Sequence, residues 1–410
     1  MEWKERIWQE AGELQDILRG HQSTLHRSPE VGFALKQTCA YVKEQLQKMG
    51  YTPLQCGKAG WVVTVGGHQP GKVFLLRADM DALPIQEETL AEDAAGNGYM
   101  HACGHDFHTS MLLGAAALLK KHEQEIKGAI KLMFQPAEEL LEGARDMIEA
   151  GVLLNPAVDG ALMVHVMAGL PLPTGTCIVS SPGVSAPAAD YFTIEIQGKG
   201  CHGSSPNTGI DPLTAAVHVL IGLQELTARE LGTDEVAVLT IGSVNGGEAA
   251  NVIPDRVTMK GTLRAFREDV RERLKKRMEE IAVGIAGAFR ARATVTFGSG
   301  CPTLVNDRSL SEFVAVQLKE LLGETYCHTS KELEAQMAEK GGGKMSGSED
   351  FAYVSHEVPS VMLALAAGEP SKGYLYPQHH PKVQFDKEVL SVGAAIYAYT
   401  ALTWLEKYSK

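Results

Sequence analysis

The stretch GKVFLLRADMD, residues 71–81, is an apolar run that ends in acidic residues. A short apolar run bounded by glycine is typical of a strand in the interior of a sheet. Residues 109–121 and 137–151 have helical spacing, and AIKLMFQP, residues 129–136, predicts a second buried strand. Strands that alternate with helices indicate an α/β fold, in which a mostly parallel, mixed sheet carries helices on both faces.

The pattern changes at about residue 187 and changes back at about residue 300. Between these points the expected elements are strand 190–200, helix 211–231, strands 236–247 and 256–266, helix 268–291 and strand 293–299. The order β-α-β-β-α-β is that of a ferredoxin-like α+β sandwich. We therefore expect an α/β domain formed by residues 1–186 and 300–410, interrupted by an inserted ferredoxin-like domain at 187–299. A glycine-rich loop is expected at 339–350.

Composition limits the classes of protein to which this chain can belong. A chain of 410 residues that is 44% hydrophobic and 21% charged is ordinary for a soluble protein of two domains. The formal net charge is −12 and no basic stripe stands out, which argues against nucleic acid as a partner. No signal peptide or membrane-spanning run is recognisable, so we expect a cytoplasmic protein without a membrane partner. Seven irregularly spaced cysteines do not resemble a disulfide framework.

Potential metal ligands gather where predicted strands end. These residues are Asp79, Asp81, Cys103, His105, Glu138, Glu139 and His165, with His379 much further along the chain. In an open α/β sheet, ligands bind beyond the carboxyl ends of the strands. Thiolate, imidazole and carboxylate together suit Zn²⁺ or a similar cation. The joint occurrence of these groups favours a metal site over chance.

The adjacent acids Glu138 and Glu139 point to a division of labour. Neighbouring side chains diverge by roughly 100° on a helix and about 180° on a strand, so one carboxylate can bind metal while the other acts as a base. The pair is also predicted to open the helix at 137–151, where negative charge is favoured. Solvated acids in a first helical turn are an equally good interpretation of the pair taken by itself.

Each of the other groups also has an ordinary structural interpretation. Asp79 and Asp81 could form a turn, and His165 could be a satisfied core histidine. Cys103 could be a small buried apolar residue. The stretch MHACGHDFH, residues 100–108, is therefore a metal loop, the site of a thiol nucleophile or a polar loop that caps a helix. Its remaining histidines, at positions 101 and 108, have no partner in the pattern, and we interpret them as structural residues or as supports close to the site.

The inserted region has two further candidates. His202 lies in GKGCHGSSPNTGIDP, residues 198–212, and Asn251 lies in NGGEAANVIPD, residues 245–255. Glycine, serine, asparagine and proline favour turns, so turn formation is the ordinary interpretation of both stretches. The first lacks the G-x-S-x-G spacing of a nucleophile elbow.

An ordered set of motifs resembles one known family. The motifs are HRSPEVGF at 26–33, RADMDALPIQEE at 77–88, MHACGHD at 100–106, FQPAEE at 134–139, HVMAGLPLPTG at 165–175, HGSSPNTGIDP at 202–212, GGEAANVIPD at 246–255, GSEDFAYV at 347–354 and HHPKVQFD at 379–386. The chain is similar to the dinuclear metallopeptidase family of aminoacylases and carboxypeptidases. Within it, the chain resembles the branch of hippurate hydrolases, N-acyl-amino-acid amidohydrolases, auxin-conjugate hydrolases and N-acetyldiaminopimelate deacetylases.

The resemblance implies a catalytic domain that holds two divalent metal ions, of Zn, Mn, Co or Ni. The implied metal ligands are Cys103, which bridges the ions, and His105, Glu139, His165 and His379. Glu138 would be the general base, and Asp79 and Asp81 would support the site from close by.

The resemblance also implies that the inserted domain acts as a lid and joins subunits in a homodimer or larger homo-oligomer. From this domain, often that of the partner subunit in relatives, His202 would approach the scissile carbonyl. Asn251 and Arg264 would hold the substrate, through its carboxylate. Phe107 departs from the pattern, because many members of the branch have glycine there, and we expect it to reshape the acyl or leaving-group pocket.

The implied reaction is the hydrolysis of an N-acyl amino acid, with an acetyl, benzoyl or related acyl group, by a metal-activated water. One alternative is a dipeptidase, aminopeptidase or carboxypeptidase of the same family. A second is a thiol hydrolase in which Cys103 is the nucleophile and His105 or His165 is the base. A third is a binding protein without catalytic activity.

Overall fold

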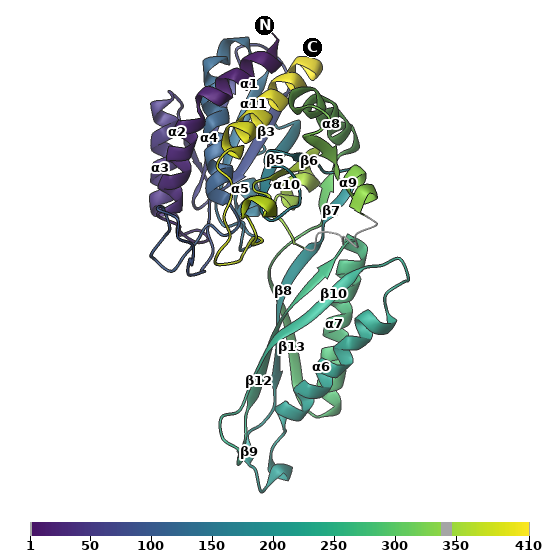
Figure 1. The fold of residues 1–410 in the computed structure, drawn as a ribbon. Helices are drawn as coiled ribbons and strands as arrows, with labels where there is room; N and C mark the ends of the chain where they lie inside the picture. Colours follow the sequence, from purple (N-terminus) through teal and green to yellow (C-terminus); the bar gives the residue numbers. More distant parts are fainter. Residues whose placement is uncertain (1, 338–346, 410) are drawn as a thin grey trace. The chain divides into compact units, whose positions relative to one another are not determined.

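The computed structural model describes residues 2–337 and 347–409 (Figure 1). Most of the glycine-rich loop expected at 339–350 lies outside the described residues. The chain separates into two compact units. The first contains the described residues of Met1–Ser185, Val305–Lys344 and Asp350–Lys410, and the second contains those of Ala186–Leu304 and Met345–Glu349.

The first unit is built on an 8-stranded sheet with the order β1-β2-β4-β3-β5-β16-β6-β15. The strands are Leu54–Cys56 (β1), Gly60–Gly66 (β2), Val73–Asp79 (β3), Ala129–Gln135 (β4), Gly160–Met167 (β5), Cys177–Val179 (β6), Cys327–Thr329 (β15) and Ser360–Ala366 (β16). The central strands β4, β3, β5 and β16 run parallel, whereas β1, β2 and β6 each have an antiparallel neighbour. The predicted mixed sheet is therefore confirmed.

Helices cover both faces of this sheet. They are Trp3–Glu13 (α1), Gln15–His26 (α2), Lys36–Lys48 (α3), His105–Lys121 (α4), Gly143–Glu149 (α5), Arg308–Leu322 (α8), Ser330–Met337 (α9), Ala352–Glu357 (α10) and Val389–Tyr408 (α11). On one face, α4 and α11 pack against each other and against β3 and β5. On the other face, α5 and α10 pack together next to β4 and β16. This arrangement confirms the predicted α/β architecture.

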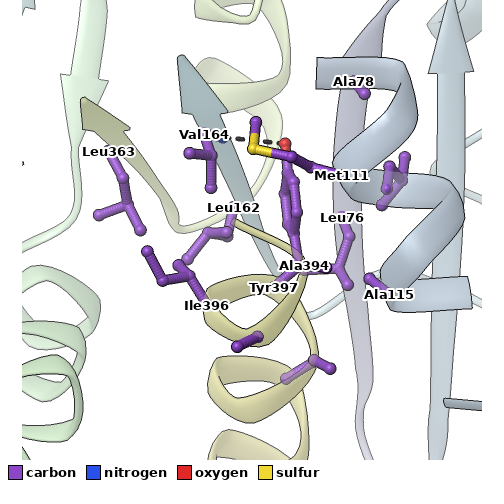
Figure 2. Packing of buried hydrophobic residues seen from close by; sticks show 14 of the residues in the cluster. Leu76, Ala78, Met111, Ala115, Leu162, Val164, Leu363, Ala394, Ile396 and Tyr397 are labelled. Atoms are coloured by element: carbon purple, nitrogen blue, oxygen red, sulfur yellow. Dashed lines mark hydrogen bonds between the residues drawn. The ribbon is translucent and has the colours of Figure 1, made fainter. Parts of the chain in front are cut away.

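The core lies between the sheet and the pair α4 and α11 (Figure 2). Leu76 and Leu162 are fully buried there beside Tyr397, whose phenol is also within the apolar cluster. The Tyr397 hydroxyl accepts a hydrogen bond from the Val164 N–H at 3.0 Å and donates one to the Arg77 carbonyl at 2.7 Å. Burying each large aliphatic side chain contributes about 1.5–3 kcal/mol, so this layer fixes the position of β3 and β5.

The helix α11 is apolar enough to span a membrane by composition, and 78% of its most apolar window is buried inside the first unit. It lies in the core against α4, as Figure 1 shows for the yellow helix, so its composition is that of a core helix.

The second unit contains a four-stranded antiparallel sheet with the order β10-β12-β8-β13, together with two helices. Its main elements are Ala188–Gln197 (β8), Pro212–Arg229 (α6), Ala237–Asn245 (β10), Arg256–Ala265 (β12), Glu268–Ala288 (α7) and Arg292–Cys301 (β13). The chain order and the strand order are those of a ferredoxin-like fold, as predicted. A separate short ribbon pairs Cys201–His202 (β9) with Val252–Ile253 (β11). The segments Gly183–Ala186 (β7) and Leu304–Asn306 (β14) pair with each other.

Candidate metal centre

The helix that carries the metal loop begins one turn earlier than its sequence spacing predicts. α4 begins at His105, whereas the pattern predicts a helix over 109–121. Gly104 precedes the helix with φ 90°, a left-handed conformation that glycine adopts without strain. The first turn is polar in sequence but fully buried, because Asp106 Oδ2 is paired with His26 Nδ1 at 2.7 Å. The buried partner, which the local pattern does not reveal, explains the difference.

The two adjacent acids do not open a helix, which corrects the prediction of a helix over 137–151. α5 covers only Gly143–Glu149. Ala137 and Leu141 take φ values of 54° and 55°, in the left-handed region that a helix cannot contain. Such strain in non-glycine residues persists only where the surroundings enforce it and is concentrated at functional sites.

Asp81 holds the turn that presents Glu138 and Glu139. Its Oδ1 accepts a hydrogen bond from the Glu138 N–H at 2.9 Å, and its Oδ2 accepts one from the Glu139 N–H at 3.2 Å. The same carboxylate lies 3.5 Å from His105 Nδ1. Asp81 is 1% exposed, so these contacts occupy it fully and make it a support for the site.

The five predicted ligands converge in the first unit. Cys103 Sγ lies 3.6 Å from His165 Nε2 and 3.4 Å from His379 Nε2. Glu139 Oε1 lies 3.4 Å from His379 Nε2 and 4.0 Å from His105 Nε2. His379 has a left-handed φ of 65°, a second strained position at this site. One thiol, three imidazoles and a carboxylate thus meet beyond the carboxyl ends of the parallel strands.

Hydrogen bonds fix the tautomers of two histidines. His165 Nδ1 donates to the Val166 carbonyl at 2.7 Å, so in the neutral ring the lone pair lies on Nε2, the nitrogen that faces Cys103. His108 Nε2 accepts from the Val166 N–H at 2.8 Å, so Nδ1 carries the proton and donates to Asp79 Oδ1 at 2.6 Å. Burial lowers the pKa of His108 to about 3, which keeps this ring neutral.

Asp79 is committed to buried partners. Besides His108, its Oδ2 accepts a hydrogen bond from Arg77 Nη1 at 2.7 Å, and Arg77 Nη2 donates to Asp350 Oδ1 at 2.9 Å. Burial raises the pKa of Asp79, but the charges of His105 and Arg77, together with the hydrogen bond from His108, outweigh it and hold the pKa well below its usual value. Asp79 therefore lies behind the ligand cluster as an anion that orients the histidines.

The donor set fits a divalent cation. His105 Nε2 and Glu139 Oε1 are buried, lie 4.0 Å apart and have no hydrogen-bond partner among the residues that the structure describes. Buried polar atoms are nearly always paired, so these orphaned atoms are explained by a cation at the point where they meet. Burial and Glu139 raise the pKa of Cys103, but His165 and His105 outweigh them and lower it to about 6. The thiolate is the form that binds metal.

The other predicted site residues, His202, Asn251 and Arg264, belong to the second unit. His202 is exposed in β9, and its Nδ1 accepts hydrogen bonds from the Ser204 N–H at 3.1 Å and the Ser204 hydroxyl at 2.8 Å. Asn251 is exposed directly before β11, the strand that pairs with β9. Arg264 is partly buried on β12. The structure thus brings His202 and Asn251 together on one ribbon and places Arg264 on the main sheet of the unit.

Phe107 is buried and does not line an open pocket, whereas we expected it to reshape the acyl or leaving-group pocket. It is 2% exposed and lies in the core, where its ring centroid is 5.4 Å from that of Phe385. A side chain on Gly104 would meet the same Phe385 ring at 3.2 Å. Because α4 begins at His105, Phe107 is its third residue and belongs to the buried face of the helix. The sequence pattern, which predicts a loop here, does not reveal this.

Sequence reasoning missed Arg77, Gln135 and Asp350 among the buried supports of the site, and it did not name the partners of His108. Arg77 and Gln135 both donate to Asp350, and His108 joins Asp79 to the end of β5. Two signals were available. A charged residue inside a continuous apolar strand, as at position 77, requires a buried partner. A histidine three residues after His105 shares its helix face.

The comparisons with known proteins agree with this geometry. A model of Peptidase family M20/M25/M40 matches residues 75–403. The chain is 37% identical over 400 residues to "IAA-amino acid hydrolase ILR1-like 4" of Arabidopsis thaliana, which is 95% of this chain and 86% of that protein. It is 34% identical over 388 residues to "N-acetyl-L-cysteine deacetylase" of Bacillus subtilis, which is 94% of this chain and 87% of that protein.

Two solved structures have the same fold. A putative aminohydrolase from methicillin-resistant Staphylococcus aureus has a TM-score of 0.87 at 32% identity, covering 98% of this chain and 100% of that one. The Bacillus subtilis YXEP protein, described as a dinuclear metal binding peptidase from the M20 family, has a TM-score of 0.76 at 31% identity, covering 96% and 99%. The resemblance in the sequence is therefore confirmed, and the chain belongs to Peptidase family M20/M25/M40.

Proposed function

We propose that this amidohydrolase cleaves N-acyl amino acids into a carboxylic acid and a free amino acid. The observation that carries the proposal is the convergence of Cys103, His105, Glu139 and His379 beside a second, buried carboxylate, Glu138. The names of the plant and bacterial relatives, an amino acid conjugate hydrolase and a deacetylase, support an amide substrate of this kind.

The ligand cluster is proposed to hold two divalent ions, of Zn, Mn, Co or Ni. Cys103 would be shared between them, with His105, Glu139, His165 and His379 completing the set. Bound ions would polarise the amide carbonyl and make water more acidic. The orphaned donor atoms of His105 and Glu139 support this occupancy.

Glu138 is proposed as the general base. Its side chain is 6% exposed, Oε2 lies 3.9 Å from His105 Nε2, and its backbone is fixed by Asp81. Glu138 would take a proton from the attacking water at a carboxylate oxygen and later deliver it to the leaving nitrogen. Because Glu139 is paired with His379, the two neighbouring acids can have different tasks.

His202 is proposed to donate a hydrogen bond to the carbonyl oxygen as negative charge develops there. Ser204 donates to Nδ1, so in the neutral ring the proton lies on Nε2, which is then a donor toward a ligand. Asn251 and Arg264 are proposed to bind the substrate, Arg264 through the carboxylate. Losing one donor to an oxyanion typically lowers turnover by about 10²–10³-fold, so His202→Ala should lower kcat while metal content stays unchanged.

The direct test is an assay of metal-loaded protein with N-acetyl, N-benzoyl and long-chain N-acyl amino acids, and with dipeptides that have a free amino group. We expect hydrolysis of the N-acyl compounds and its loss after chelation. Faster cleavage of the dipeptides would favour the peptidase alternative. Activity that survives chelation but is abolished by a thiol alkylator would favour the alternative with Cys103 as nucleophile.

We propose further that two copies associate through the second unit. The edge strand β10 leaves one side unpaired within the described unit and exposes Val238 and Val244. The neighbouring helix α6 exposes Leu213, Val217 and Ile221 at helical spacing. An apolar stripe beside an open strand edge suits a symmetric partner.

Sedimentation analysis tests this association. Val217→Glu with Ile221→Glu should convert a dimer into a monomer, because the charges would be buried against each other. Val283→Glu on α7, where the side chain is 49% exposed, is the matched control and should leave the dimer intact. A monomeric wild-type chain would contradict the proposal.

We also propose a cytoplasmic location, and the domain boundaries 1–186, 187–299 and 300–410. The division of the described chain into two compact units after Ser185 and after Leu304 supports the boundaries.

A further inference from the structure

A second concave site lies in the first unit, outside the ligand cluster. It is a pocket of about 340 Å³ between the start of α3 and the hairpin of β1 and β2. Its walls are apolar, and the residues that matter most are Phe33, Leu35, Ala59 and Trp61. This volume is at the lower end of the range for small-molecule pockets, so a ligand about the size of a single ring with a short chain would fit.

Two lysines line this pocket, and a third lies next to one of its aromatic walls. Lys36 and Lys58 are exposed lining residues, and Lys58 Nζ lies 4.3 Å from the centroid of the Phe33 ring. Lys43 Nζ lies 5.0 Å from the centroid of the Trp61 ring. These positions concentrate positive charge on a chain whose net charge is −12.

The acids nearby offset part of this charge. Lys58 Nζ is 3.8 Å from Asp146 Oδ1, a loose ion pair, and Asp146 Oδ2 also accepts from the Lys58 backbone N–H at 2.8 Å. Glu30 accepts hydrogen bonds from the Gln37 and Thr38 N–H groups at the start of α3. Lys36 forms no ion pair with any residue that the structure describes.

An aromatic and aliphatic interior with ammonium groups at its mouth matches one ligand chemistry. The apolar body of the ligand would pack against Phe33 and Trp61, and its anionic head would meet Lys36 and Lys58. We propose that this pocket is a second binding site, distinct from the metal cluster, for a small amphipathic carboxylate. Its ligand would be an apolar acid with one carboxylate.

Both walls of the pocket continue into the segments that present the proposed base. Just before Phe33, Val31 forms a parallel bridge with Ala82, the residue after Asp81. Gly32 lies so close to Leu140 that a Cβ there would be 2.8 Å from Leu140 Cδ1, and Leu140 directly follows Glu139.

On the other wall, Trp61 pairs with Phe134 of β4, the strand that leads to Glu138. A ligand that orders both walls would therefore alter the placement of Glu138 more than the binding of substrate. We expect occupancy to change kcat by about twofold or more with little change in KM.

The binding experiment uses full-length protein, first stripped of metal, with 3-phenylpropanoate as probe and the uncharged 3-phenylpropanol as its counterpart. Calorimetry should give saturable binding of the acid, with a Kd of about 1 mM or lower, and weaker binding of the alcohol. Because metal-free protein is used, the outcome does not depend on whether the proposed hydrolysis is correct.

Matched variants locate the site. Lys36→Gln with Lys58→Gln should weaken binding about tenfold, Lys36→Arg with Lys58→Arg should retain it, and Ala34→Leu should obstruct the pocket. Lys127→Gln with Lys276→Gln removes two lysines outside the pocket and should leave binding unchanged, as should His379→Ala. No saturable binding, or equal binding by the double glutamine variant, would overturn the second site. Binding that leaves kcat unchanged in metal-loaded protein would overturn its coupling to Glu138.

Discussion

Glu138 is positioned through its backbone. The N–H of Glu138 and that of Glu139 are both held by Asp81, within a turn bounded by left-handed Ala137 and Leu141. A conservative change of the side chain should therefore leave the turn intact and isolate the chemistry.

We predict that Glu138→Gln lowers kcat by about 10²–10⁴-fold, the contribution typical of a positioned base, because an amide cannot accept the proton of the water. Metal content, measured by elemental analysis of the dialysed protein, should match the wild type. Glu139→Gln is the informative comparison, since it should reduce metal content as well as turnover. A Glu138→Gln variant with near-normal kcat would refute the role of the base.

Tyr397 shows how a single buried hydroxyl connects the core to the site. It accepts a hydrogen bond from the Val164 N–H of β5 (Figure 2). It also donates one to the Arg77 carbonyl of β3, and Arg77 supports Asp79. Tyr397→Phe fills the same volume but leaves the Val164 N–H buried without its acceptor. We expect the free energy of unfolding in urea to fall by about 1–3 kcal/mol. Tyr408→Phe, at a phenol that is 39% exposed, is the control and should change it little.

At the scale of elements, the spacing of apolar residues predicts those helices and strands whose position depends on the local sequence. The apolar strands β3 and β4 and the ferredoxin-like order of the second unit follow from runs and alternation in the sequence. The first residues of α4 and α5 cannot be predicted from this spacing. His105 enters a helix because Gly104 turns left-handed and Asp106 finds a partner in α2, which is far away in the sequence.

The site shows the same division between local and distant causes. The pattern of chemistry-bearing residues at strand ends was enough to predict that Cys103, His105 and Glu139 meet. It did not single out Arg77 as a support, because Gln135 and Asp350 lie far along the chain and become its neighbours only in the folded unit. His108 is expected to be structural or supporting, but its partners Asp79 and Val166 cannot be named from the pattern. Geometry also gives each histidine a tautomer, which depends on a backbone group that no sequence motif specifies.

The contact between α2 and α4 predicts a dependence of stability on pH. Burial lowers the pKa of His26, but hydrogen bonds to Asp106 and Glu87 outweigh it and raise the pKa to about 10. Because the folded-state pKa lies above the unfolded value of about 6.5, the stabilisation is complete below that value and is lost as pH rises toward 10. The free energy of unfolding should therefore decline between about pH 7 and pH 10.

Urea unfolding across this pH range checks the sign. His26→Gln should flatten the decline, whereas His68→Gln, at an exposed histidine, should leave it unchanged. A decline that is as steep in His26→Gln as in the wild type would assign the dependence to other groups.

At the scale of the whole first unit, the ligand cluster is a long-range link. Cys103 and His105 lie before and in α4, Glu139 follows β4, His165 is in β5, and His379 precedes α11. Without a cation, the carboxylates and the low-pKa thiol at this point repel one another in a buried setting.

We therefore predict that removing metal lowers the unfolding temperature of the first unit more than that of the second unit. A cation that binds only the folded state adds about 2.7 kcal/mol of stability at a concentration of 100 times its Kd. Thermal unfolding of dialysed protein, followed with and without chelator, should show a transition that moves to lower temperature when metal is removed.

Cys103→Ala should abolish this shift, because a variant that lacks this ligand no longer gains stability from added metal. Cys177→Ala, at a buried cysteine of β6 that is not one of the proposed ligands, should keep the shift even if it lowers both transitions. Equal shifts in the two variants would mean that the metal stabilises the chain somewhere other than at this cluster.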